Sequence, residues 1–357
     1  MYIWPPALCK SNYVFQMKGK ILVTGGTGYI GSHTVVELQN AGFDVVIVDD
    51  LSNSTEAVVD QIEKITGIRP EFHHFNMQNL ELLEKFFNES KGIKAVIHFA
   101  AYKAVSESVQ KPLKYYRNNL VSLINLFECM ENSGVNNLVF SSSCTVYGQP
   151  DHLPVTEQTP RKTAESPYGN TKIVCEDIIR DYTRANPKIQ TIALRYFNPI
   201  GAHPSALIGE LPIGIPSNLV PFVTQTAAGI RPQLSVFGND YNTPDGSCIR
   251  DYINVVDLAK AHVISIERLL NHKNESVFEF FNVGTGNGVS VLALLNAFEK
   301  ATGQKVNYKI VGRRAGDIEQ IYADTTKANT VLGWKSMATL EETLLSAWNW
   351  EKRIRKI

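Results

Sequence analysis

The chain has 357 residues, of which 44% are hydrophobic and 20% are charged, a composition typical of a folded globular protein large enough for two domains. Lysine and arginine together number 35, as do aspartate and glutamate, and this balance gives no indication of a nucleic-acid partner. The five cysteines are scattered, without a CxxC pair or a Cys/His metal-ligand spacing. We therefore expect no metal site and a reducing, cytoplasmic location. No apolar run is long enough for a membrane span.

The first 16 residues differ from the rest of the chain, because they contain two prolines and show no repeating period. They lack the basic region and the long apolar region of a signal peptide. Met17 opens a segment that reads like a natural start. We expect residues 1–16 to be a non-native or disordered extension, with the folded protein beginning at residue 17.

Short apolar runs typical of buried strands alternate with helical patterns up to about residue 200. The strands are predicted at 20–24, 44–50, 71–75, 94–100, 136–143 and 190–197, and the first helix at about 29–40. This alternation predicts βαβ units and a parallel sheet covered on both faces. Residues 199–250 are rich in proline and glycine and are expected to form long loops around a helix near 217–229. The later elements are expected to be helices at 255–270, at 291–302 and from residue 340, and strands at 279–283 and 305–310.

The predicted fold class is α/β. We expect a doubly wound, Rossmann-type, NAD-binding domain over residues 17–198. Residues 199–357 are expected to form mainly a smaller α/β lobe that binds substrate.

The turn after the first strand reads TGGTGYIGSH, in which Gly25, Gly28 and Gly31 precede and open a helix. Glycines at this spacing let the backbone approach a pyrophosphate at a helix N-terminus, although the same pattern also fits a tight turn without a ligand. Asp49 strengthens the first interpretation, because an acid at the end of the second strand binds the adenosine ribose. Such an acid repels a 2′-phosphate, so the sequence favours NAD over NADP.

The stretch SPYGNTK places Tyr168 and Lys172 at positions i and i+4, behind Pro167, which suits the first turn of a helix. An ammonium group beside a phenol favours the phenolate and lowers its pKa, which would give a general base usable near neutral pH. The same spacing also fits a surface pair without a role. The strand NNLVFSSS ends in serines 141–143, and strand ends of such a sheet face the ligand crevice. One of these serines is therefore expected to reach the same reacting oxygen.

Taken together, six motifs resemble the extended short-chain dehydrogenase/reductase family over about residues 20–350: TGGTGYIGSH, SSSCTVYG, SPYGNTK, RYFNPIGAHPS, FGNDYNTPDGSCIRDYI and RRAGD. Within the family, the resemblance is to enzymes that invert C4 of a UDP-sugar. It implies reversible epimerisation of UDP-glucose and UDP-galactose, a step of galactose metabolism, through a transient 4-keto sugar and tightly bound NAD. It also implies a homodimer, formed through helices at about 104–133 and 167–186.

The resemblance also assigns site residues. It implies that Tyr168 takes the proton of the 4-hydroxyl, that Lys172 holds the ribose, and that Ser143 orients the reacting oxygen. Besides the three glycines, Tyr168 and Lys172, it implies NAD contacts at Tyr29, Ile30, Asp49, Asp50, Leu51, Ser52, Asn53, Ser54, Asn76, Met77, Phe99, Ala100, Ala101, Tyr102, Lys103, Asn118 and Phe197. Besides Ser143 and Tyr168, it implies substrate contacts at Thr145, Asn198, Asn218, Leu219, Phe237, Arg250, Arg314, Asp317 and Ile321. The forked donors of the two arginines match phosphate oxygens, and the alternative for each is a surface ion pair.

Three positions depart from the family pattern. Asn76 stands where an aspartate usually contacts the adenine amino group, and its amide oxygen can still accept a hydrogen bond. Asn254 replaces a common histidine, with no consequence that the sequence suggests. Ile321 matches the position that gates N-acetylated sugars, where tyrosine is associated with exclusion and cysteine with acceptance. Isoleucine is intermediate, so acceptance of UDP-N-acetylhexosamines stays open.

Other functions on the same scaffold remain alternatives. Another NAD-dependent nucleotide-sugar epimerase is one. A nucleotide-sugar 4,6-dehydratase would carry Thr-Asp-Glu after the serine-rich strand, whereas this chain has Ser143-Cys144-Thr145, without a carboxylate for acid–base work. An inactive NAD-binding regulator would keep the glycines but would not need the serine, the tyrosine and the lysine, all of which are present here.

Overall fold

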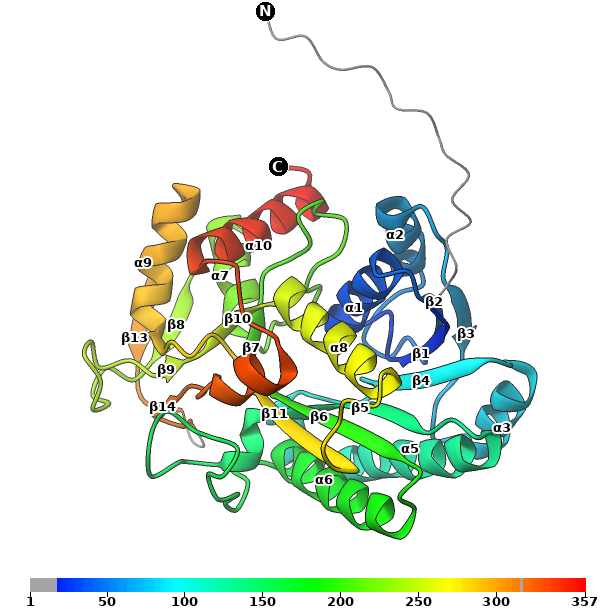
Figure 1. Ribbon diagram of the computed structural model, residues 1–357. Coiled ribbons are helices and arrows are strands. Elements are labelled where there is room, and N and C mark those ends of the chain that lie inside the picture. The colour runs from blue at the N-terminus through cyan, green and yellow to red at the C-terminus, as the bar shows by residue number, and fades with distance from the viewer. Residues whose placement is uncertain (1–17, 315–316) are drawn as a thin grey trace, which may run out of the picture.

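The structure is a computed structural model that describes residues 18–314 and 317–357, so the extension predicted at residues 1–16 lies outside the described residues. At the centre of the described chain, seven parallel strands form one sheet (Figure 1). In spatial order, the strands are β11 (Phe278–Val283), β6 (Gln190–Tyr196), β5 (Asn137–Ser143), β4 (Ile93–His98), β1 (Lys20–Thr24), β2 (Asp44–Asp49) and β3 (Glu71–His74).

Helices cover both faces of this sheet (Figure 1). On one face lie α1 (Tyr29–Asn40), α2 (Ala57–Thr66) and α8 (Val255–Leu270), and on the other α3 (Leu80–Glu89), α5 (Pro112–Ser133) and α6 (Pro167–Ala185). Successive strand residues supply the two cores, because side chains alternate between faces. Ile21 and Val23 belong to the cluster under α1 and α8, whereas Leu22 belongs to the cluster under α5 and α6. The predicted doubly wound parallel sheet is confirmed.

A second lobe is built from the C-terminal half of the chain. Its helices are α7 (Leu219–Ala227), α9 (Val291–Thr302) and α10 (Leu340–Arg355), and its short strands are β7 (Asn198–Ile200), β8 (Leu234–Phe237), β9 (Ile249–Arg250), β10 (Tyr252–Asn254), β12 (Val289–Ser290), β13 (Tyr308–Val311) and β14 (Gln320–Ile321). A separate apolar cluster, which includes Val220, Phe298 and Trp348, holds the three helices together.

Residues 255–283 leave this lobe and join the main sheet. Strand β11 pairs with β6 in parallel, from Phe278 opposite Thr191 to Val283 opposite Tyr196. Helix α8 packs over the same sheet, and the side chain of Asn254 caps it by accepting hydrogen bonds from the backbone N–H groups of Val256 and Asp257. Residues 255–283 lie beyond the predicted boundary at residue 198, but they pack with the main sheet, because β11 pairs with β6.

The strand order fixes where a ligand can bind. From β1 the chain builds outward through β2 to β3, and from β4 it builds in the opposite direction through β5 to β6. In such sheets the ligand crevice opens at the carboxyl ends of the strands where the order reverses, here between β1 and β4. The glycine turn, Asp49 and the serine-rich segment all lie at strand carboxyl ends. No described helix is long and apolar enough to cross a membrane.

Candidate active site

The glycine turn after β1 is packed too tightly for larger residues. Gly25 has a φ of +71°, and a Cβ on it would lie 2.8 Å from the backbone nitrogen of Ala100. A Cβ on Gly31 would lie 2.2 Å from the carbonyl oxygen of Gly25. Gly28 occupies the N-cap of α1, so no side chain covers the first N–H groups of the helix. These groups and the positive end of the helix dipole suit a pyrophosphate, and the cradle therefore fits a dinucleotide.

Asp49 lies beside this turn at the end of β2, and only 8% of the residue is exposed. One carboxylate oxygen accepts the backbone N–H of Thr27 at 3.1 Å and the other that of Leu51 at 2.9 Å. Each carboxylate oxygen can accept a second hydrogen bond, which leaves capacity for ribose hydroxyls. The following loop closes over the turn through a 2.6 Å contact between the hydroxyls of Thr27 and Ser54. This geometry fits the predicted role of Asp49.

Asn76 is held by its neighbours. Its amide nitrogen donates to Asp50 Oδ2 at 2.8 Å, and its amide oxygen accepts the backbone N–H of Gln78 at 2.8 Å. An aspartate here would place a second carboxylate against Asp50, so the amide removes a like-charge contact. The amide oxygen still has one lone pair for an adenine amino group.

The loop that follows β4 is fixed by a residue that the sequence reasoning missed. Asn119, on α5, accepts the backbone N–H of Tyr102 at 2.9 Å and donates to the Tyr102 carbonyl at 3.1 Å. It also donates to Thr171 Oγ1 at 3.0 Å, which ties the loop to α6. The neighbouring Asn118, which was predicted to contact NAD, donates to the same Asn119 side chain. The consecutive asparagines in YRNNL were the available signal, and the resemblance assigned only one of them.

The structure distinguishes the three serines at the end of β5. Ser142 points to the other face from its neighbours and donates to Glu176 Oε1 at 2.6 Å. Glu176 is paired with Arg195 at 2.6 Å, and both are buried. The Ser141 hydroxyl contacts the hydroxyl of Tyr196. Ser142 and Ser141 are therefore engaged in the packing of the sheet.

Ser143 is the serine that meets the tyrosine. Its hydroxyl accepts the backbone N–H of Thr145 at 3.3 Å, and it lies close enough to Tyr168 to lower the pKa of that phenol. Tyr168 lies in the first turn of α6, which Pro167 begins and which Ser166 caps through the backbone N–H of Gly169 at 3.2 Å. The predicted Ser143–Tyr168 neighbourhood thus forms between a strand end and a helix start.

Lys172 lies one turn after Tyr168, as the spacing predicted. Its ammonium donates to the carbonyl oxygen of Ser141 at 2.6 Å and lies 6.0 Å from the centre of the Tyr168 ring. Burial lowers the pKa of Lys172 to about 8. Burial also raises the pKa of Tyr168 to about 12, and the neighbouring Ser143 hydroxyl opposes this rise. In the protein without cofactor the pKa of Tyr168 therefore lies above its ordinary value, because desolvation is the largest effect on the phenol, and a lowering that includes the charge of NAD+ stays a prediction.

Ile321 joins this centre from the second lobe. It is 2% exposed and packs in one apolar cluster with Cys144 and Phe197. Strand β14 carries it alongside β9, where it lies opposite Arg250. Arg250 donates to the carbonyl oxygen of Ile249 at 2.8 Å. The predicted substrate residues 250 and 321 are therefore adjacent to each other, and Ile321 shares an apolar cluster with the residue that follows Ser143.

Other predicted substrate residues lie elsewhere in the second lobe. Arg314 pairs with Asp317 at 2.7 Å, and its guanidinium lies 5.1 Å from the centre of the Phe237 ring. The predicted alternative of an ion pair is thus realised for Arg314. Asn218 precedes α7 and donates to Glu210 Oε1 at 2.5 Å. Within the described residues, no group of three or more His, Cys, Asp or Glu side chains could hold a metal ion.

The sequence was compared with known proteins. A family model described as GDP-mannose 4,6 dehydratase matches residues 22–346. The chain is 50% identical over 332 residues to a UDP-glucose 4-epimerase of Dictyostelium discoideum, a match that covers 93% of this chain and 95% of that protein. It is also 50% identical over 331 residues to a UDP-glucose 4-epimerase of Bacillus subtilis (strain 168), covering 93% and 96%. The chain belongs to the UDP-glucose 4-epimerase family, within the extended short-chain dehydrogenases/reductases.

Solved structures of the UDP-glucose 4-epimerase family share the fold. The crystal structure of the enzyme from Stenotrophomonas maltophila, with bound NAD and formylated UDP-arabinopyranose, matches with a TM-score of 0.91 at 46% identity and covers 95% of this chain and 99% of that one. The enzyme from Bifidobacterium longum, in complex with NAD+ and UDP, matches with a TM-score of 0.89 at 46% identity and covers 94% and 98%. The resemblance predicted from the six motifs is confirmed.

Proposed function

We propose that this protein interconverts UDP-glucose and UDP-galactose by reversible epimerisation at C4, using tightly bound NAD. The observation that carries the proposal is the Ser143–Tyr168–Lys172 arrangement at the mouth of a dinucleotide cradle, in a chain that is half identical to UDP-glucose 4-epimerases. The 4,6-dehydratase alternative is not favoured, because the segment after β5 carries no carboxylate for the elimination of water.

The residues of the cradle fit NAD. The backbone around Gly25, Gly28 and Gly31 receives the pyrophosphate, and Asp49 accepts from the adenosine ribose. Bound NAD+ supplies a hydride acceptor, and later a hydride donor, for C4 of the sugar. Lys172 is placed to hold a ribose hydroxyl with its remaining donors, since one already binds the Ser141 carbonyl.

The proton chemistry belongs to Tyr168 and Ser143. The Ser143 hydroxyl orients the 4-hydroxyl of the sugar, and Tyr168 removes its proton as C4 loses hydride. The resulting 4-keto sugar rotates within the site so that C4 takes hydride on its other face, while Tyr168 returns the proton to the oxygen at C4. The positive charges of Lys172 and of the oxidised nicotinamide bring the pKa of Tyr168 down from its value in the protein without cofactor.

One assay tests this function. The purified protein is given UDP-galactose without added NAD, and UDP-glucose is measured, while NAD is quantified after denaturation of the same sample. We expect turnover and about one NAD per chain. A 4-keto-6-deoxy product would instead identify a dehydratase, and bound NAD without turnover would identify a non-catalytic NAD-binding protein.

We further infer a homodimer and a cytoplasmic location. Apolar side chains are exposed on α4 (Val105–Gln110) and α5, with Val109 61%, Leu113 78% and Ile124 41% exposed. A second copy that packs against α5 and α6 would cover part of this face, and sedimentation at several protein concentrations measures the mass. The four cysteines of the described residues are buried free thiols, which suits a reducing compartment.

A further inference from the structure

One carboxylate lies between the residues proposed for the cofactor and those proposed for the substrate. Glu210 stands in the long loop between β7 and α7, and its side chain is 12% exposed. Its Oε1 atom lies 3.3 Å from the ammonium of Lys103, in the loop that follows β4. The same oxygen accepts the Asn218 amide at 2.5 Å, directly before α7. Glu210 therefore contacts a predicted NAD residue and a predicted nucleotide-sugar residue at once.

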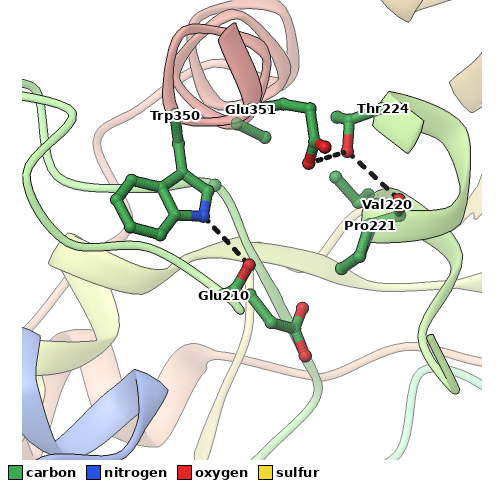
Figure 2. Close-up of a pocket in the computed structure, with 8 residues that line it drawn as sticks. Glu210, Val220, Pro221, Thr224, Trp350 and Glu351 are labelled. Carbon is green, nitrogen blue, oxygen red and sulfur yellow. Dashed lines mark hydrogen bonds between the residues drawn. The ribbon is translucent and has the colours of Figure 1, made fainter. Parts of the chain in front are cut away.

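The backbone of Glu210 is held from a third direction, by helix α10. The indole N–H of Trp350 donates to the Glu210 carbonyl oxygen at 3.0 Å (Figure 2). The ring covers Gly209 so closely that a Cβ there would lie 2.5 Å from the Trp350 Cγ atom. The next residue, Glu351, is buried and accepts from Thr224 on α7 at 3.2 Å (Figure 2). Helix α10 thus fixes the Glu210 backbone within the second lobe, independently of the cofactor loop.

A second contact joins the main sheet domain to the second lobe close by. The hydroxyl of Tyr29, in the first turn of α1, donates to the Gly201 carbonyl at 2.7 Å. The ammonium of Lys103 lies 5.8 Å from the centre of the Tyr29 ring. Tyr29 connects the two parts by a neutral hydrogen bond, whereas Glu210 contributes a charge. The charge distinguishes the two contacts, because of these two groups only the Glu210 carboxylate can form a charge-assisted contact with the ammonium of Lys103.

We propose that Glu210 is a positioning residue for both sites: it orients Lys103 toward the cofactor and Asn218 toward the nucleotide sugar, and so couples retention of NAD to binding of the UDP-sugar. This rests on the proposed function, which assigns Lys103 to NAD and Asn218 to the substrate. Asn218 keeps its amide nitrogen on Glu210 and offers its amide oxygen to a bound nucleotide, so the nucleotide holds the carboxylate in place beside Lys103. Binding of UDP therefore preserves the orientation of Lys103 and slows the release of NAD.

The substitution Glu210→Gln separates the two contacts. It keeps an oxygen that can accept the Asn218 amide but removes the charge that holds Lys103, whereas Glu210→Ala removes both. Glu341→Gln is the matched control, because Glu341 also pairs with a lysine, Lys300, at 3.7 Å on the exposed surface of the same lobe. The measured quantities are the rate of NAD release from the holoenzyme with and without UDP, and kcat and KM for UDP-galactose.

In the wild type and in Glu341→Gln, UDP should slow the release of NAD by about five-fold, the lower end of typical couplings between sites. In both Glu210 variants this ratio should fall to about one. The KM for UDP-galactose should rise in Glu210→Ala and return toward the wild-type value in Glu210→Gln. If Glu210 had a purely structural role, both variants would change the NAD release ratio and the KM together, and the melting temperature would change with them.

A double variant tests the path through Lys103. If Glu210 acts on the cofactor through that ammonium, Lys103→Met combined with Glu210→Gln should release NAD no faster than Lys103→Met alone. An additional acceleration would overturn the coupling, as would an effect of UDP on NAD release that is the same in the wild type and in Glu210→Gln. If Glu210→Ala does not fold, Glu210→Gln decides, because its side chain has the same size. Failure of the proposed function is recognised separately, by a wild type that holds no NAD or shows no turnover.

Discussion

The electrostatic role of Lys172 can be worked out from the structure and tested by Lys172→Met. Burial raises the pKa of Tyr168 to about 12 even with Lys172 in place, so at neutral pH almost no phenolate is present before NAD+ adds its positive charge. The Lys172 ammonium lies 6.0 Å from the ring centre. With an effective dielectric constant of about 20, a charge at that distance stabilises the phenolate by about 3 kcal/mol, or about two pKa units.

Methionine keeps most of the volume of the lysine side chain but carries no charge. The pKa of Tyr168 in the variant should therefore lie about two units higher, and kcat at pH 7 should fall by about 100-fold. The loss should shrink as the pH rises past about 8, because Lys172 in the wild type then loses its own charge and the two proteins become alike. Since burial lowers the pKa of Lys172 itself to about 8, the advantage of the wild type should be greatest below pH 8.

The assay is the pH dependence of kcat from pH 6 to 10 under saturating UDP-galactose. NAD content is measured in each sample, because Lys172 is also predicted to hold the ribose. A melting curve shows that the variant is folded. If kcat falls by the same factor at every pH, Lys172 only positions the reactants, and the electrostatic argument is refuted.

Three further outcomes are expected. Tyr168→Phe should retain NAD and lose about 10²–10⁴-fold in turnover, measured as kcat, because only the proton-transferring oxygen is removed; activity within a few-fold of wild type would contradict its role. Asp49→Ala should release NAD faster, because the ribose loses its acceptor; an unchanged release rate would mean that the cofactor lies elsewhere. Burial lowers the pKa values of His33 and His98 to about 3 and of His262 to about 4. Stability should therefore be lost as the pH falls below about 6.5, by about 2 kcal/mol per histidine at pH 5, and equal urea unfolding free energies at pH 7 and pH 5 would contradict this.

The local elements were predictable because each carries its own signal. Helix α1 ends near Gly42, α6 begins behind Pro167, and α8 shows continuous apolar spacing, and all three were expected close to their observed bounds. The cofactor cradle was predictable for the same reason, since its glycines and Asp49 are local to one βαβ unit. Strand β11 was recognised as a strand, but its pairing with β6 depends on a partner more than 80 residues away, which local pattern does not encode.

The chemistry of the site was less predictable than its location. The residues alone left open which of the three serines meets Tyr168, because that depends on the side of β5 to which each points, and only the family resemblance pointed to Ser143. The rise in the pKa of Tyr168 without cofactor was not foreseen, because burial is a property of the folded state. Asn119 and Glu210 were missed for a related reason: each acts on a loop or helix remote in sequence. The paired asparagines were a signal for Asn119 that does not name its partner, and Glu210 stands in no motif that signals such a contact.

Ile321 is the residue that we expect to decide which UDP-sugars the enzyme accepts. The hypothesis is that its side chain lies beside the 2-substituent of the sugar. Its burial with Cys144 and Phe197, close to Ser143, makes a contact with a bound sugar feasible. Because isoleucine is branched at Cβ, it is stiff and cannot easily swing aside. We expect UDP-glucose to be the better substrate, with weak but measurable turnover of UDP-N-acetylglucosamine.

Because Ile321 is buried, substitutions at this position also affect stability, and the measurement has to separate that effect from specificity. Ile321→Tyr forces a ring into a packed cluster, at a cost of about 1–3 kcal/mol, and Ile321→Gly leaves a cavity of comparable or greater cost, so either variant can lower the amount of folded enzyme. The ratio of kcat/KM for the two substrates is unaffected by that loss, because both reactions use the same folded molecules. Ile321→Tyr should abolish turnover of UDP-N-acetylglucosamine and spare that of UDP-glucose, and Ile321→Gly should shift the ratio the other way, within the roughly 10–200-fold that size discrimination provides. A ratio that is constant across the three proteins would show that Ile321 stabilises the cluster without lining the pocket, and that the substrate is selected elsewhere.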